Sequence, residues 1–184
     1  EGAVGAGAGT VAFGWKGGIG TSSRILPSTL GGYTVGVLVQ SNFGGILQIR
    51  GAPVGRELGQ YAFADQVGHN EEYNPGADVQ EWGSIMIVVA TDAPLSDRNL
   101  ERIARRAIMG LSRTGSYASN GSGDYVIAFS TSEQVRRSTA DGVQRYSDLS
   151  NNNVSALFEA TLEATEEAIY NSLFMAETVT SNGR

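Results

Sequence analysis

The side chains of this sequence leave few ways to make a nucleophilic site. The chain has no cysteine and a single histidine, His69. A thiol nucleophile is therefore excluded, and a Ser-His-Asp triad would have to use His69. No serine lies in a Gly-x-Ser-x-Gly elbow. A serine hydrolase with this composition needs another base. The α-amino group of a serine at a chain terminus could serve, because it titrates at about pH 8 within reach of its own hydroxyl.

Ser84 fits this requirement. It follows Gly83 at the end of a polar segment and precedes the apolar run 85–90. Cleavage between Gly83 and Ser84 would free the serine amine, and we expect Gly83 to tolerate the strained dihedrals of an N-to-O acyl shift. The local pattern alone favours a plain strand start, because many strands begin after glycine.

The elements that must position Ser84 follow from the hydrophobic pattern. Runs of β-branched and aromatic residues predict strands over 10–15, 33–40, 84–91 and 124–131. The strand at 84–91 is apolar throughout, so we expect it to be buried on both faces. Residues 53–83 lack periodicity and predict a long exposed loop.

Two amphipathic helices complete the pattern. Apolar residues recur at helical spacing from Leu100 to Leu111, after a turn and cap at 92–96 and before Gly115. A second apolar face runs over 154–173 and includes Thr161 and Thr165. Two helices with single apolar stripes and antiparallel-type strands predict an α+β fold of sheets flanked by helices.

The overall composition excludes several classes of function. A net charge of −6 argues against non-specific nucleic-acid binding and favours small or peptide-like substrates. No apolar run approaches the roughly 18 residues of a membrane span. A chain of 184 residues can form one domain without disulfides or structural metal. The absence of cysteine leaves the compartment open between a bacterial cytoplasm and periplasm.

Two further motifs predict neither a cofactor nor a metal. The glycine run 2–9 has no preceding strand and no closing Lys-Ser/Thr, so we interpret it as a place where backbone packs on backbone rather than a phosphate cradle. His69 with Glu71 and Glu72 could ligate a metal, but this grouping on a polar loop favours solvated charge.

Several blocks in order resemble the family of L-aminopeptidase/D-esterases and β-peptidyl aminopeptidases, which are self-processing hydrolases of the N-terminal-nucleophile type. The blocks cover residues 2–10, 16–24, 37–44, 83–94 and 168–173. The resemblance implies a precursor cut between Gly83 and Ser84, an αββα layered sandwich, and a homo-oligomer of αβ units.

The same resemblance assigns the site residues. Ser84 resembles the new N-terminal nucleophile and Asn42 the oxyanion-stabilising asparagine. Ser122 resembles a second active-site serine, and Asp124 a nearby acid that is glutamate in some members. The local sequence alone predicts a turn residue for Asn42, and it predicts an ordinary glycine-rich hairpin for Ser122 and Asp124.

The resemblance also divides the chain. Residues 1–83 correspond to the C-terminal part of the α chain and residues 84–184 to part of the β chain, together forming one structural domain. The family's first α segment and last β segment have no counterpart here, and the sequence begins without Met. We therefore expect a fold that is incomplete at both ends.

The resemblance therefore implies a serine aminopeptidase or amidase that cuts itself at Gly83–Ser84 and removes N-terminal residues, including β- or D-amino acids, from short peptides, amides or esters. One alternative is a non-catalytic assembly fragment whose unpaired strand edges pair between chains. Another is a self-processing acyltransferase, although such enzymes ordinarily use threonine where this chain has Ser84.

Overall fold

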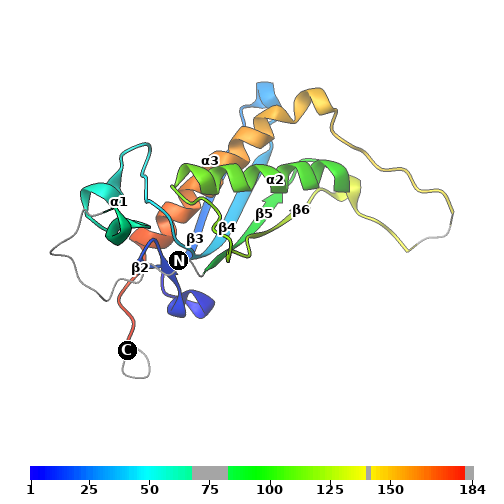
Figure 1. Ribbon diagram of the computed structural model, residues 1–184. Coiled ribbons are helices and arrows are strands. Elements are labelled where there is room, and N and C mark those ends of the chain that lie inside the picture. The colour runs from blue at the N-terminus through cyan, green and yellow to red at the C-terminus, as the bar shows by residue number, and fades with distance from the viewer. Residues whose placement is uncertain (68–82, 140–141, 181–184) are drawn as a thin grey trace.

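A four-stranded sheet forms the centre of the molecule (Figure 1). The computed structural model describes residues 1–67, 83–139 and 142–180. The strands lie in the order β3-β4-β5-β6, with bounds Gly18–Ile25, Thr34–Asn42, Ser84–Thr91 and Tyr125–Ser130. Strands from both sides of the Gly83–Ser84 bond therefore share one sheet, since β4 and β5 are neighbours.

Strand direction changes at β5. The pairs β3–β4 and β4–β5 are antiparallel, whereas β5 and β6 are parallel. Parallel neighbours need a crossover, and helix α2 (Asp97–Arg113) provides it. The prediction of antiparallel-type strands is thus confirmed for three strands and wrong for β6.

Both long helices cover the same face of the sheet (Figure 1). Helix α3 (Ser155–Phe174) packs on β3 and β4, and α2 lies beside α3 against β6 and β5. The core between helices and sheet is apolar and fully or almost fully buried; its members include Val35, Val37, Val39, Ile85, Ile87, Val89, Ile103, Leu111, Leu157 and Ile169. The predicted helices are confirmed, as is the burial of Thr161 and Thr165.

The opposite face of the sheet is open. Met86 is 40% exposed, whereas its neighbours Ile85 and Ile87 are 0% and 1% exposed. The prediction that β5 is buried on both faces is therefore wrong, because no second layer lies over this face among the described residues. The α+β class is confirmed, and the described residues form two of the four expected layers, one of helices and one of strands.

The predicted strand over 10–15 is divided in two. Strands β1 (Val11–Ala12) and β2 (Trp15–Lys16) form a small hairpin. Phe13 and Gly14 turn the chain between them with φ of 54° and 84°. Two successive residues with positive φ match the tight hairpin turn that suits the twist of paired strands.

The glycine-rich start packs closely against the edge of the sheet. Gly5–Gly9 forms a 3₁₀ helix, η1. A Cβ on Gly7 would lie 2.8 Å from the carbonyl oxygen of Gly2, and one on Gly20 would lie 1.8 Å from that of Ala168 in α3. The predicted packing of backbone on backbone is confirmed here, and it extends into β3.

The remaining segments are short or irregular. Four are further helices: η2 (Ser28–Leu30), α1 (Val54–Glu57), η3 (Ala64–Gln66) and η4 (Glu133–Val135), while η5 (Asn151–Asn153) leads into α3. Helix α1 and η3 interrupt the loop predicted for 53–83, and His69, Glu71 and Glu72 lie outside the described residues. None of the helices described is both long and apolar enough to cross a membrane.

The start of α2 differs from the expected capping pattern. Ser96 occupies the N-cap position, but its side chain makes no cap hydrogen bond to the helix. Instead its hydroxyl and its backbone N–H donate to the carboxylate of Asp148, at 2.8 and 2.9 Å. A distant aspartate thus accepts the N-cap N–H, as the glutamate of a capping box does.

Candidate active site

Ser84 and Asn42 face each other at one end of the sheet. Ser84 is the first residue of β5 and Asn42 the last residue of β4, and the two are paired in the antiparallel register. Both are half-buried, and their neighbours Ile85 and Ser41 are fully buried on the helix side. Because side chains alternate along a strand, Ser84 and Asn42 point to the open face.

Gly83 passes close to the end of β4. A Cβ at this position would lie 2.1 Å from the carbonyl oxygen of Asn42 and 2.8 Å from Cα of Phe43. The φ of Gly83 does not lie in the left-handed region. Glycine is therefore required here for close approach of two backbones, and its tolerance of the dihedrals of an acyl shift stays a prediction.

The loop before β6 contacts Ser84 directly. The backbone N–H of Gly123 donates to Ser84 Oγ at 3.1 Å. Asp124 Oδ1 accepts the hydroxyl of Ser122 at 2.6 Å and the backbone N–H of Ile85 at 3.2 Å. The aspartate thereby fixes this loop to the residue that follows Ser84, and it orients the Ser122 hydroxyl.

Asn42 is held from the other side. Its Oδ1 accepts the backbone N–H of Val11 at 3.0 Å. An N–H can donate only to the oxygen of a carboxamide, so this bond fixes which way the amide is turned. Asn42 Nδ2 has no acceptor within residues 1–67, 83–139 and 142–180, which leaves two donors available for a ligand.

The structure therefore brings all four residues singled out from the sequence, and Gly83, to one end of the sheet. The loop supplies Ser122 and Asp124, and the strand ends supply Asn42 and Ser84. Sequence reasoning missed the N–H of Gly123, because a backbone donor is defined by loop conformation and not by residue type. The arrangement offers a hydroxyl on a partly exposed strand end, a carboxamide donor and a second hydroxyl, which together suit acyl transfer.

A metal site has no support in the part of the chain that the structure describes. No group of three histidine, aspartate or glutamate side chains gathers there in a way that could hold an ion. Asp124 is instead occupied by two hydrogen-bond donors.

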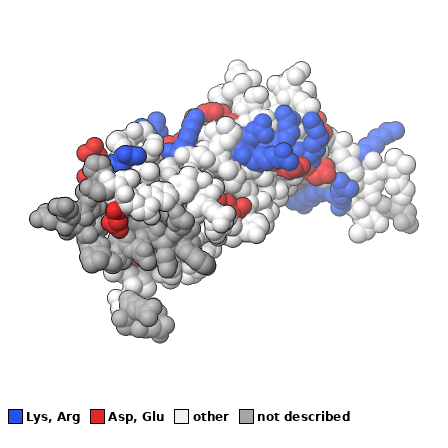
Figure 2. Space-filling model, in the orientation of Figure 1, with Lys and Arg blue, Asp and Glu red and all other residues white. Residues whose placement is uncertain are grey.

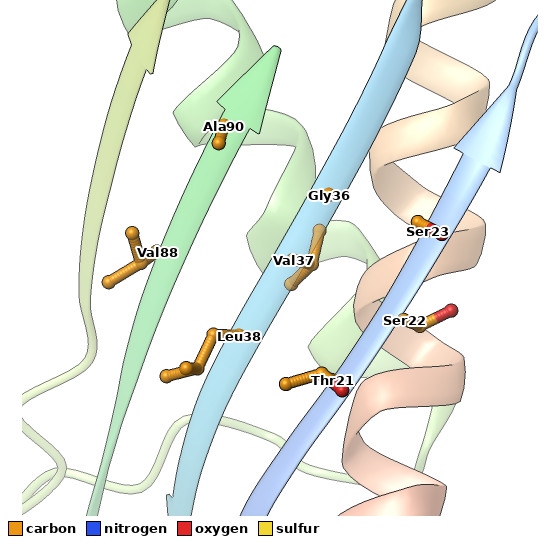
Figure 3. A pocket seen from close by; sticks show the side chains of 8 residues that line it. All are labelled: Thr21, Ser22, Ser23, Gly36, Val37, Leu38, Val88 and Ala90. Carbon is orange, nitrogen blue, oxygen red and sulfur yellow. The ribbon is translucent and has the colours of Figure 1, made fainter. Parts of the chain in front are cut away.

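A shallow groove crosses the open face farther along the same strands. It has a volume of about 390 Å³, and Figure 3 views it with the helices behind the strands. Its lining includes Thr21 and Ser23 of β3, Leu38 of β4 and Val88 of β5. The groove is therefore mostly apolar toward β5 and hydroxyl-bearing toward β3.

The helix side of the molecule carries the clustered charges. Figure 2 shows arginine side chains gathered over α2, which contributes Arg98, Arg102, Arg105, Arg106 and Arg113. Arg106 lies 4.1 Å from the centre of the Phe158 ring, and Arg102 donates to Asn151 at 2.8 Å. These contacts fasten α2 to α3 and to η5 on the face away from Ser84, so Arg102 and Arg106 have structural roles.

Comparison with known proteins identifies the class. Residues 1–184 match the family model described as Peptidase family S58. The chain belongs to this peptidase family.

The chain is also similar to individual proteins of known name or structure. The chain is 44% identical over 188 aligned residues to a β-peptidyl aminopeptidase BapA from Sphingosinicella microcystinivorans, covering 98% of this chain and 46% of that relative. It superposes on the PH0078 protein from Pyrococcus horikoshii OT3 with a TM-score of 0.81 and 46% identity, covering 100% of this chain and 47% of the other.

A third protein links the fold to a reaction class. The L-aminopeptidase D-Ala-esterase/amidase from Ochrobactrum anthropi matches with a TM-score of 0.76 and 34% identity, covering 96% of this chain and 45% of that protein. That protein is described as a prototype for the serine aminopeptidases and as a variant of the Ntn hydrolase fold. The chain spans about half the length of the curated relatives it matches.

Proposed function

We propose that the protein of which this chain is part is a serine aminopeptidase with Ser84 as its N-terminal nucleophile. The observation that supports this most is the meeting of Ser84 with Asn42 and with the Ser122–Asp124 loop, directly after Gly83. Membership of a peptidase family and relatives named as aminopeptidases support the same reaction class.

The first step of the proposal is self-processing. Ser84 Oγ attacks the carbonyl carbon of Gly83 and the hydroxyl proton passes to the departing nitrogen, so that an ester replaces the peptide bond. Water then hydrolyses this ester to give the Gly83 carboxylate and a chain that begins at Ser84. The paired strands β4 and β5 hold the two pieces together after the cut, since eight residue pairs from Val35–Thr91 to Asn42–Ser84 join them.

The second step is aminopeptidase turnover. The free amine of Ser84 takes the hydroxyl proton as Oγ attacks the substrate carbonyl, and the proton passes to the leaving amine, with the Ser122 hydroxyl as a relay. Asn42 Nδ2 donates to the oxygen that gains charge, which lowers the barrier by roughly 3 kcal/mol. Water then releases the acyl group from Oγ and restores the amine and the hydroxyl.

Substrates and assembly follow the same proposal. Short peptides, amides or esters with a free N-terminal residue would be the substrates, and the working unit would be an αβ pair within a homo-oligomer. The net charge of −6 suits small substrates better than a polyanion.

One observation favours a different candidate function. The open sheet face exposes large apolar side chains, including Leu38, Tyr125 and Ile127 at 41%, 64% and 64%. Such a face is typical of a contact surface. A non-catalytic assembly fragment would use this face and would have no need of Ser84.

The test compares Ser84→Ala with Ser23→Ala in the full-length protein. Ser23 lies on β3 and also faces the open side, so it controls for the loss of a hydroxyl from this face. With an aminoacyl p-nitroanilide as substrate, Ser84→Ala is expected to lower kcat by roughly 10⁴-fold or more, as the loss of a nucleophile does, and Ser23→Ala to leave kcat unchanged. Equal kcat in both variants would contradict Ser84 as the nucleophile, whereas no hydrolysis by the wild type or by either variant would support the assembly function.

A further inference from the structure

Lys16 is the single lysine of the sequence, and its side chain is half-buried. Its Nζ donates to the carbonyl oxygens of Gly7, Thr10 and Gly17 at 2.6, 3.1 and 2.7 Å. An ammonium group has three donors, and here backbone carbonyls take all of them. Burial lowers the pKa of Lys16. No carboxylate lies within ion-pair distance of this ammonium among the residues described.

By binding these three carbonyls, the Lys16 ammonium joins helix η1 to the hairpin β1–β2. Gly7 belongs to η1, whereas Thr10 and Gly17 flank the small hairpin β1–β2. Two more hydrogen bonds join the same residues: the Thr10 hydroxyl donates to the Gly7 carbonyl oxygen, and the Gly17 N–H donates to the Thr10 carbonyl oxygen, both at 3.0 Å. The ammonium therefore lies where three carbonyl dipoles converge, and removing it would leave them pointing at one another.

The hairpin that Lys16 closes is the one that holds Asn42. Val11 is the residue paired with Lys16 in the hairpin, and its N–H donates to Asn42 Oδ1. Phe13, in the hairpin turn, donates its N–H to the Phe43 oxygen at 2.7 Å and packs edge-on against the Phe43 ring. A shift of the hairpin would therefore be transmitted to both Asn42 and the residue after it.

We infer that Lys16 is a positioning residue for catalysis, which sets the orientation of the Asn42 carboxamide through the Val11 N–H. The inference rests on the proposed oxyanion role of Asn42. Without the ammonium, the Thr10–Val11 backbone relaxes, Asn42 Oδ1 loses its fixed donor, and the amide can turn its oxygen toward the developing negative charge. A misplacement of about 1 Å in such a site costs up to roughly 100-fold in rate.

A double-mutant cycle separates positioning from general stabilisation of the fold. Lys16→Met, Asn42→Ala and the double variant are made in the full-length protein, with Lys16→Arg as the conservative replacement. Arg105→Met is the control for the loss of a cation as such, because Arg105 is exposed and pairs with Glu101 on α2, far from the site. Rates are normalised to the fraction of chain that begins at Ser84, measured by mass spectrometry.

The expected result has three parts. Lys16→Met lowers kcat by roughly 10- to 100-fold with KM changed by less than about two-fold, Lys16→Arg recovers most of the loss, and Arg105→Met changes neither value. In the Asn42→Ala background, Lys16→Met adds less than about a two-fold loss, because the amide it acts through is absent. If Lys16→Met does not fold, Lys16→Gln takes its place in the cycle with the same expectation.

Two results would overturn the inference in distinguishable ways. If Asn42→Ala lowers kcat but the Lys16 variants leave it unchanged, or lower it by the same factor in both backgrounds, Lys16 does not act through Asn42. If Asn42→Ala itself keeps full kcat, the proposed role of Asn42 is wrong and the inference fails with it.

Discussion

Polar side chains on the two faces of the central sheet differ in burial and in hydrogen bonding. Ser41 faces the helices, is fully buried, and has its Oγ 2.7 Å from that of Ser172 in α3. Asn42, the next residue, faces the open side and keeps its amide nitrogen without an acceptor among the described residues. The polar group on the helix face is hydrogen-bonded within the core, whereas the one on the open face remains available for a substrate.

The largest expected effect is on catalysis at this adjacent pair. Asn42→Ala should lower kcat by roughly 100- to 1000-fold, equivalent to about 3 kcal/mol, because an oxyanion donor is lost. Ser41→Ala should change kcat by less than about three-fold and lower the free energy of unfolding by about 1 kcal/mol through its lost hydrogen bond. Steady-state kinetics and chemical denaturation measure both. A larger kcat loss for Ser41→Ala than for Asn42→Ala would reverse the assignment of the two faces.

The next effect compares two strand glycines. Gly20 of β3 faces α3, and an added Cβ would lie 1.8 Å from the Ala168 oxygen; Gly36 of β4 faces the open side, with nothing within 4 Å. Gly20→Ala should therefore destabilise the protein by about 3 kcal/mol, because α3 must move away from the sheet. Gly36→Ala should change stability by less than about 0.5 kcal/mol. Thermal unfolding of both variants measures this. Equal losses would mean that the open face is covered as tightly as the helix face.

The smallest effect lies on the helix side, at the start of α2. Partial burial alone would raise the pKa of Asp148, but hydrogen bonds from Ser96 and Asn99 outweigh it and hold the pKa below its usual value. Asp148→Asn should cost about 1 kcal/mol at neutral pH, since the carboxylate accepts the N-cap N–H. Because the folded-state pKa is lowered, this stability is present above the unfolded-state pKa of about 3.9 and disappears as the pH falls through the folded-state value. Urea unfolding at pH 7 and pH 3 measures it. A difference between wild type and variant that is as large at pH 3 as at pH 7 would contradict this explanation.

The sequence predicted the helix face better than the open face. The apolar periodicity predicts both helices and strands β4, β5 and β6, because each of these elements buries one apolar face between the helices and the sheet. Strand β3 was missed: it has Gly18 and Gly20 where a core strand usually has large apolar residues, since the backbone of α3 approaches too closely for a side chain at Gly20. The double burial expected for β5 failed because its composition does not show which layer covers each face.

The candidate site could be predicted only in part. The absence of cysteine and the single histidine favour Ser84 as nucleophile from residue types alone. Asn42, Ser122 and Asp124 came only from the family resemblance, because each has an ordinary structural reading in its local sequence. The Gly123 N–H and the Lys16 ammonium left no pattern to find, since one is a backbone donor and the other binds carbonyls that a loop conformation brings together.

The central claim is that Ser84 becomes a chain terminus and then acts as the nucleophile. Intact-mass analysis of the purified, active full-length protein tests it most directly, with Ser84→Ala as the comparison. The account predicts a fragment that begins at Ser84 in the active protein, and a single uncut, inactive chain in the variant. An active protein in which the Gly83–Ser84 bond is intact would contradict it.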